Sequence, residues 1–255
     1  MTLWTRTSGK GAELLLVHGW GMNASVWLTL AKVLEKDYRV TLVELPGHGE
    51  SPWNPATRLE DWAEQVLAAA PADAVWLGWS LGGLVMMQAA LLQPQKLRAL
   101  VGVATSPCFV QRKDWDCAIP AAVLESFAAE LETDSRRTLR RFLSLQVQGA
   151  ADAKDLLLRL RREFDSRPLP NPAALQTGLD ILLHSDLRRA LATLDLPSAW
   201  LLGERDTLVP KSLAHALTGL QPQAEVHVID GAAHAPFLSH PGQCLKRLEA
   251  FIRHV

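Results

Sequence analysis

The sequence lacks the features that mark membrane-spanning, secreted and nucleic-acid-binding proteins. It has no run of about 18 apolar residues, so no membrane-spanning helix is expected. Its first residues, MTLWTRTSGKGAE, contain no apolar core of a signal peptide. The formal net charge is only -1, which gives no overall field that favours nucleic acid or a membrane. We therefore expect a cytoplasmic monomer with neither of these partners.

Cysteine is also scarce. The chain has three cysteines, Cys108, Cys117 and Cys244, which are widely spaced and form no C-x-x-C motif. An odd, scattered set argues against a disulfide framework and against a thiolate metal site. We expect three reduced, buried thiols.

Length and apolar content bound the fold class. A chain of 255 residues that is 48% hydrophobic can form one large domain with a sizeable core. Short apolar runs alternate with helical patterns, which is typical of a doubly wound, mostly parallel sheet. The predicted strands are residues 14–18, 40–45, 74–78, 99–104, 199–203 and 226–229, and the clearest predicted helices are 59–70, 84–92 and 243–253.

One interval interrupts this alternation. From about Pro107 to Asp195 the sequence has no convincing strand and shows several amphipathic helical patterns separated by prolines and Gly149. A helical insertion of this size between two core strands predicts a lid. We expect an α/β core made of residues 1–109 and 190–255, with the lid at residues 110–189.

A serine stands in a glycine-rich turn after a predicted strand. The segment Gly78-Trp79-Ser80-Leu81-Gly82 fits G-x-S-x-G and precedes a predicted helix. In that context the motif is typical of a nucleophile elbow, which presents the serine hydroxyl above the sheet. An ordinary strand-to-helix turn is the alternative, because the pentapeptide alone is common.

A nucleophilic serine needs a base and an acid that orients the base, in the chain order Ser, acid, His for this type of fold. Asp206 follows the predicted strand 199–203, with Glu204 as a rival nearer the strand end. His234 follows the last predicted strand in a loop of small residues. His240, just before a proline, fits better as a helix cap.

An oxyanion hole needs two backbone amides near the nucleophile. The residue after the serine, Leu81, provides one, and Trp20 in His18-Gly19-Trp20-Gly21 provides the other. Although His18 borders this loop, it has no partners at metal-ligand spacing. We expect neither a metal ion nor an organic cofactor.

With these motifs in place, the chain resembles α/β-hydrolases over nearly its whole length. Within them it resembles the biotin-pathway esterases that act on the methyl ester of pimeloyl-[acyl-carrier protein]. The segments that carry the resemblance are LLLVHGWGMNASVW (14–27), VELPGHGES (43–51), AVWLGWSLGGLV (74–85), SPCF (106–109), RRFLSLQ (140–146) and GAAHAPFLSHP (231–241).

The resemblance implies an α/β-hydrolase fold with a helical lid and a serine carboxylesterase that releases methanol and leaves the acyl chain on its carrier. It implies an acyl carrier protein as the partner. The substrate contacts that it implies are Trp20, Leu81, His234 and the stretch Phe142, Leu143, Ser144, Leu145 and Gln146.

The predicted lid is strongly basic. Residues 136–162 contain eight Arg and Lys against two Asp, a net charge of +6, whereas the rest of the chain carries -7. Like-charged pairs four residues apart do not stabilise a helix, so helix stability does not explain the charge. We interpret it as a docking surface for the acidic carrier, the alternative being a solvated face. The predicted docking residues are Arg137, Arg141, Lys154 and Arg159, with Leu158 interrupting the basic row.

Other functions fit the same motifs. A broad short-chain esterase, a thioesterase or a carbon–carbon bond hydrolase would use the same three catalytic residues. Haloalkane dehalogenases and epoxide hydrolases are disfavoured, because those relatives carry Asp where Ser80 stands. A non-catalytic ligand receptor of this fold is the alternative from another class, and the intact catalytic set argues against it.

Overall fold

The structure is a computed structural model that describes residues 2–55 and 58–255. A sheet in the order β1-β3-β2-β4-β5-β6-β7 forms its centre. Neighbouring strands run parallel except for the edge strand β1, which is antiparallel to β3. The strands are β1 (Thr5–Gly9), β2 (Ala12–Val17), β3 (Tyr38–Val43), β4 (Ala74–Trp79), β5 (Leu97–Val103), β6 (Ser198–Gly203) and β7 (Glu225–Ile229).

The six predicted strands are confirmed, each within two residues of its expected ends. Strand β1 was missed because its sequence, TRTSG, is polar and almost entirely exposed, so it carries no apolar pattern. The three cysteines are buried and unpaired, as predicted.

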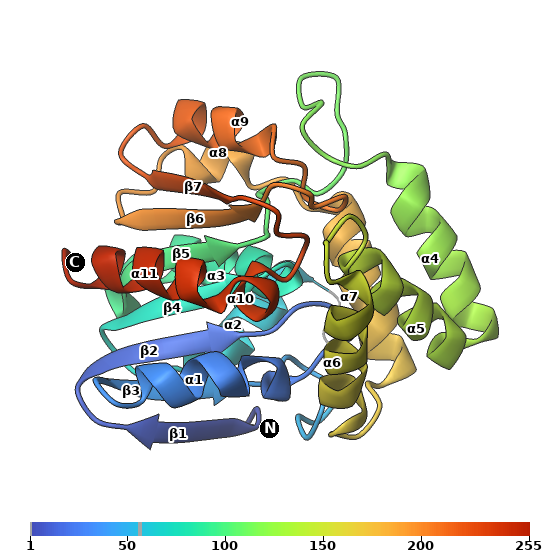
Figure 1. Cartoon of the computed structure of the whole chain (residues 1–255), viewed down its shortest axis with the longest axis horizontal. Helices are drawn as coiled ribbons and strands as arrows, with labels where there is room; N and C mark the ends of the chain where they lie inside the picture. Colours follow the sequence, from blue (N-terminus) through green and yellow to red (C-terminus); the bar gives the residue numbers. More distant parts are fainter. Residues whose placement is uncertain (1, 56–57) are drawn as a thin grey trace.

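Helices cover both faces of the sheet, as the doubly wound pattern predicts. In Figure 1, α1 and α11 lie in front of the sheet and α2 and α3 behind it. The predicted helices 59–70, 84–92 and 243–253 are confirmed, although α3 begins three residues early, directly after Ser80. Among the described helices, none is both long and apolar enough to cross a bilayer. The core helices are α1 (Leu28–Leu34), α2 (Leu59–Ala69), α3 (Leu81–Leu92), α8 (Arg188–Leu191), α9 (Leu213–Leu220), α10 (Pro236–Ser239) and α11 (Pro241–Ile252), with short 3-10 helices η1 (Ala24–Trp27) and η2 (Pro94–Lys96).

The chain between β5 and β6 forms the helical insertion that the sequence predicts. The helices α4 (Ala121–Thr133), α5 (Ser135–Gln146), α6 (Ala153–Asp165) and α7 (Pro172–His184) gather at the end of the sheet toward which the parallel strands point (Figure 1). The described part of this interval contains two isolated bridges but no strand. These four helices are called the lid below, and its division from the core at 110 and 189 stays a prediction.

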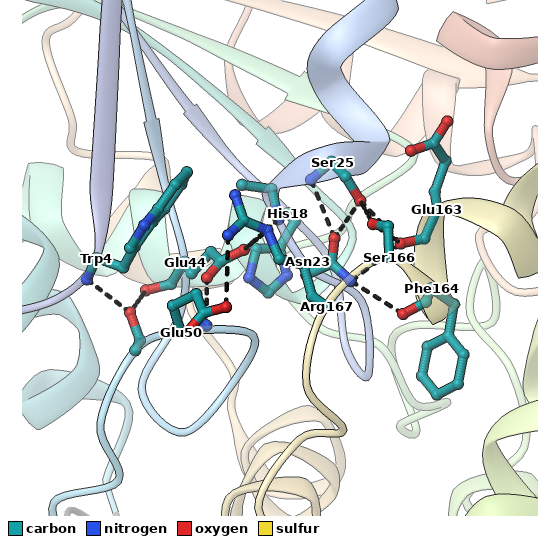
Figure 2. Close-up of polar contacts among 12 residues, drawn as sticks. Trp4, His18, Asn23, Ser25, Glu44, Glu50, Glu163, Phe164, Ser166 and Arg167 are labelled. Atoms are coloured by element: carbon teal, nitrogen blue, oxygen red, sulfur yellow. Dashed lines mark hydrogen bonds and ion pairs between the residues drawn. The ribbon is translucent and has the colours of Figure 1, made fainter.

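The lid is tied to the loop after β2 through the end of α6. Asn23 donates from its side-chain amide to the carbonyls of Glu163 (3.2 Å) and Phe164 (3.3 Å), and the Ser25 hydroxyl donates to Glu163 as well (2.8 Å). Figure 2 shows these groups meeting at the helix end. The last carbonyls of a helix have no partner within it, so the core loop satisfies groups that would otherwise be orphaned.

A buried carboxylate lies beside this anchor. Glu44 accepts hydrogen bonds from the amides of Ala24 (3.1 Å) and Glu50 (2.6 Å), and Arg167, just past α6, lies 3.6 Å away (Figure 2). Burial nevertheless raises the pKa of Glu44 above its ordinary value. The carboxylate fills the place where a side chain at Gly49 would be, because a Cβ there would lie 2.2 Å from its Oε2.

Two buried histidines, His18 and His48, complete this polar region. Their ring centroids are 5.4 Å apart and neither is exposed to solvent. Burial, together with the neighbouring His48, lowers the pKa of His18 to about 3. Burial lowers the pKa of His48 to about 4. Both imidazoles are therefore neutral at physiological pH.

A matched pair of glycine substitutions tests how tightly α3 packs on the sheet. A Cβ at Gly82 would lie 2.3 Å from the His18 carbonyl oxygen, whereas one at Gly219 in α9 meets nothing within 4 Å. Gly82→Ala is expected to lower the free energy of unfolding by about 1–3 kcal/mol through overpacking. Gly219→Ala is expected to raise it by about 0.5–1 kcal/mol through helix propensity. Urea denaturation measures both, and equal effects would contradict the packing argument.

The buried His48 predicts a loss of stability in acid. The native protein keeps the ring neutral down to about pH 4, whereas the unfolded chain protonates it near pH 6.5, so stability falls as the pH drops between these values. His48→Gln removes this term, which amounts to about 3 kcal/mol at most. The test compares wild type with the variant by urea denaturation at pH 7.5 and 4.5. Glu44, whose raised pKa has the opposite effect on stability, is present in both proteins and so does not affect the comparison. The prediction is contradicted if the difference in free energy of unfolding between wild type and variant is the same at pH 7.5 and 4.5.

Candidate active site

Ser80 lies in the tight turn between β4 and α3. Its φ of 53° and ψ of -121° are unusual for a residue with a side chain. The surrounding bonds hold this conformation, because its amide donates to the Val103 carbonyl (3.0 Å) and its carbonyl accepts from Gly83 (2.9 Å) and the Thr105 hydroxyl (2.7 Å). A Cβ at Gly78 would lie 2.5 Å from the Gly83 Cα, so the turn requires glycine there. This geometry is that of a nucleophile elbow.

Asp206 and His234 are brought together by the loops after β6 and β7. The imidazole Nδ1 lies 2.8 Å from the Asp206 Oδ2, and both side chains are buried. The other carboxylate oxygen accepts from the amides of Leu208 (2.8 Å) and Val209 (2.9 Å), which fixes the carboxylate. An ionised carboxylate only accepts, so the proton lies on Nδ1 and the lone pair on Nε2. This is the tautomer that a general base requires.

The base loop is tied to the serine turn and to the lid. Trp79, which precedes Ser80, donates from its indole nitrogen to the His234 carbonyl (2.8 Å). The His234 amide donates to the carbonyl of Gln146 at the end of α5 (3.1 Å). Sequence reasoning missed both contacts, because Trp79 is a variable position of the motif and a backbone carbonyl leaves no sequence signal.

The His234 Nε2 atom is buried and makes no hydrogen bond to any described residue, Ser80 included. Ser80 is 3% exposed and His234 1% exposed. The two side chains are thus almost completely shielded from solvent. Catalytic hydrogen bonds of this kind are often formed only in the complex with substrate.

The rival residues have other partners. Glu204 accepts from the Gly231 amide (3.0 Å) and pairs with Lys211 (3.3 Å), so it holds the start of the base loop without touching the imidazole. His240 is the residue before α11 and its Nδ1 lies 2.9 Å from the Ser239 hydroxyl. Neither residue forms a hydrogen bond or ion pair with His234.

The loop after β2 approaches the serine closely. A Cβ at Gly19 would lie 3.1 Å from the Ser80 Cβ, which leaves room for little besides glycine. Leu81 is the first residue of α3, so its amide has no acceptor within the helix. In the described part of the chain, neither this amide nor that of Trp20 makes a hydrogen bond. Both are available to a developing oxyanion.

The expected substrate-contact residues of α5 take two different positions. Phe142, Leu143 and Gln146 are buried and Leu145 is half-buried. The Phe142 ring meets the Trp20 ring edge-on at 4.7 Å. Ser144, in contrast, is exposed, and its hydroxyl donates to the Arg140 carbonyl (3.1 Å). The apolar members thus cover the site, whereas Ser144 faces solvent.

One more buried polar atom belongs to the lid helix α5. The side-chain oxygen of Gln146 is buried and has no hydrogen-bond partner among the described residues. Within the part of the chain that the structure describes, no group of three His, Cys, Asp or Glu side chains is placed to hold a metal ion.

The basic residues of the lid also differ from one another. Arg137 and Lys154 are exposed, and their side chains have no ion-pair partner among residues 2–55 and 58–255. Arg141 forms a salt bridge with Glu130 and lies over the Phe127 ring. Arg159 donates to the Leu238 carbonyl and the Thr29 hydroxyl (both 2.9 Å). Arg159 therefore fastens α6 to the core, a role that the sequence did not indicate.

Known proteins resemble this chain closely in sequence. It is 41% identical over 251 residues to an Aliivibrio fischeri protein named pimeloyl-[acyl-carrier protein] methyl ester esterase, with 98% of this chain and 97% of that protein covered. A Klebsiella pneumoniae protein of the same name is 45% identical over 240 residues, covering 94% and 93%. A third, from Xylella fastidiosa, is 42% identical over 252 residues, covering 98% of both chains.

Solved structures agree on the fold. An esterase from Exiguobacterium antarcticum superposes with a TM-score of 0.88 at 17% identity, covering 98% of this chain and 95% of that one. A hydrolase from Oleispira antarctica gives 0.87 at 21% identity, covering 98% and 94%. The family model described as alpha/beta hydrolase fold matches residues 13–241. The chain belongs to the α/β-hydrolase family.

Proposed function

We propose that this protein is a serine carboxylesterase that hydrolyses the methyl ester of pimeloyl-[acyl-carrier protein], releasing methanol and leaving the acyl chain on the carrier. The observation that carries the proposal is identity of 41–45% to esterases of that name over nearly the whole chain. The Asp206–His234 pair beside the Ser80 elbow supplies the chemistry. The reaction is the biotin-pathway step that the motif resemblance implies.

The first step forms an acyl-enzyme. The Ser80 hydroxyl attacks the ester carbonyl while the His234 Nε2, which carries the free lone pair, takes its proton. Asp206 holds the imidazole through the 2.8 Å bond and stabilises its charged form. The amides of Trp20 and Leu81 stabilise the negative charge on the carbonyl oxygen.

The second step releases the acid. The imidazolium returns its proton to the departing methoxy group, so methanol leaves. Water then attacks the acyl-Ser80 ester while His234 takes one of its protons, and the imidazolium gives that proton to the Ser80 oxygen as the ester bond breaks, so the acid leaves and the serine hydroxyl is restored. These steps need only the side chains and amides named, so we propose no metal or cofactor for the reaction.

The lid supplies the apolar surroundings of the acyl chain. Phe127, Phe142 and Leu143 are buried, and the Phe142 ring lies 4.7 Å from the Trp20 ring and 5.4 Å from the Phe127 ring. A pimeloyl chain that passes beneath α5 would replace contacts among these side chains by contacts with its own methylene groups. The apolar contacts that these side chains lose when the acyl chain enters are thus offset by their contacts with the acyl chain.

The outer face of the lid is the proposed docking surface for the carrier. Arg137 on α5 and Lys154 on α6 are exposed and unpaired, so an acidic partner can approach both without breaking an ion pair. Arg141 is paired with Glu130, so it would bind the carrier by exchanging one carboxylate partner for another. Arg159 belongs to this surface only through its charge, since its guanidinium is bound to core groups.

The central test measures kcat/KM for methyl pimeloyl carrier protein and for free short-chain esters. Wild type is expected to release methanol from the carrier-bound ester with the higher kcat/KM. Ser80→Ala is expected to lower activity on both substrates by at least about 10⁴, because the nucleophile is lost. Preferential cleavage of the thioester, which frees the carrier, would support the thioesterase alternative. No turnover and no covalent labelling of Ser80 would support the receptor alternative.

Charge reversal tests the docking surface. Arg137→Glu combined with Lys154→Glu is expected to lower kcat/KM for the carrier-bound ester by at least about tenfold, because steering and rim contacts are lost. Hydrolysis of a small soluble ester is expected to change less than twofold. The matched control is Lys246→Glu with Arg247→Glu on α11, which makes the same charge change at exposed residues outside the lid. Equal losses in the two double variants, or on both substrates, would rule out docking at this surface.

A further inference from the structure

The loop that carries the Trp20 amide is held from both sides by the buried histidines. The His18 Nδ1 lies 2.8 Å from the Gly19 carbonyl oxygen, and the Gly21 amide lies 3.3 Å from the His48 Nε2. Each histidine therefore contacts one of the two peptide units that flank Trp20. We propose that His18 and His48 are positioning residues that aim the Trp20 amide at the oxyanion. This inference rests on the proposed ester hydrolysis and goes beyond it.

The contact of His18 acts on the donor itself. The Gly19 carbonyl and the Trp20 amide belong to the same planar peptide unit, with the C=O and N–H pointing in opposite directions. A hydrogen bond that fixes the carbonyl therefore fixes the direction of the amide. The Met22 amide also donates to this carbonyl (3.3 Å), so two donors hold one edge of the unit. Donation to the carbonyl further polarises the N–H toward the site.

The contact of His48 holds the next peptide unit. Gly21 has a φ of 67°, and a Cβ there would lie 2.5 Å from Leu139 of the lid. The loop therefore turns sharply just after Trp20, in a conformation that favours glycine. The bond from the Gly21 amide to His48 fixes this turn without help from a side chain at Gly21.

The partners of each imidazole determine which nitrogen carries the proton. At His18, Nδ1 faces the Gly19 carbonyl and Nε2 accepts from the Leu45 amide (3.0 Å). At His48, Nδ1 faces the Pro46 carbonyl (2.9 Å) and Nε2 accepts from Gly21. Carbonyls only accept and amides only donate, so both rings are the neutral Nδ1–H tautomer. Burial, which lowers the pKa of both groups, keeps them in that form.

Asparagine and glutamine can each replace the hydrogen bond of one imidazole nitrogen but not of the other. The asparagine amide lies near the position of Nδ1, and the glutamine amide lies near that of Nε2. At position 18 the contact that matters is the Nδ1 donor, which His18→Asn keeps and His18→Gln loses. At position 48 it is the Nε2 acceptor, which His48→Gln keeps and His48→Asn loses. The proposal thus predicts opposite rankings at the two positions.

The experiment measures kcat and KM on a p-nitrophenyl ester, with active sites counted by fluorophosphonate titration so that misfolded protein does not enter. It also measures Ki for a trifluoromethyl ketone, whose adduct with serine places a negative oxygen at the oxyanion position. His18→Gln is expected to lose at least about tenfold more kcat than His18→Asn, and His48→Asn at least about tenfold more than His48→Gln. The ceiling is the 10²–10³ that removal of one oxyanion donor typically costs. Ki is expected to rise in proportion, with KM changing little.

The control separates positioning from general destabilisation. Gln221 is buried, accepts from the Trp200 indole (3.2 Å) and makes no hydrogen bond to Ser80, Asp206, His234 or the loop that carries Trp20. Gln221→Ala is expected to lower the melting temperature while leaving kcat and Ki unchanged. The same ranking of Asn and Gln at both histidines, or losses confined to KM, would overturn the proposal. Absence of esterase activity in wild type would instead contradict the proposed function, so the two failures are distinguishable.

Discussion

The bond between the His234 Nδ1 and the Asp206 Oδ2, 2.8 Å long, is the interaction on which the proposed chemistry depends. It fixes the tautomer and leaves the lone pair of Nε2 free for the serine proton. The parallel sheet makes this bond possible, because β6 and β7 are neighbours and their carboxyl ends open on the same edge. The serine turn after β4 opens on that edge too, so residues far apart in sequence meet there.

The lid is part of this site as well as its cover. The carbonyl of Gln146 holds the backbone of His234, and Phe142 packs on the Trp20 ring. Movement of α5 therefore changes the surroundings of the base and of the oxyanion loop together. In the proposed function, the surface that binds the carrier and the surface that shapes the catalytic centre are two faces of the same helices.

The strands and the catalytic candidates could be predicted because each leaves a local signal. Ser80 has a motif, and Asp206 and His234 directly follow apolar strands in the expected order. The antiparallel strand β1 could not be predicted, because it is an exposed edge with no apolar pattern. The contacts of Arg159 and the exposure of Ser144 could not be predicted either, because both depend on how α5 and α6 are rotated against the core.

The buried carboxylate of Glu44 has a consequence for how this chain can change. Its Oε2 lies 2.2 Å from where a Cβ at position 49 would be, and its other oxygen binds the amide of Ala24 in the loop after β2. Positions 44 and 49 are therefore coupled by packing: a side chain at 49 needs a shorter residue at 44, and the φ of 54° at Gly49 would strain it even then. Such a replacement would leave the amides of Ala24 and Glu50 without their acceptor, whereas Arg167 would keep Glu50 and the Trp4 ring as partners.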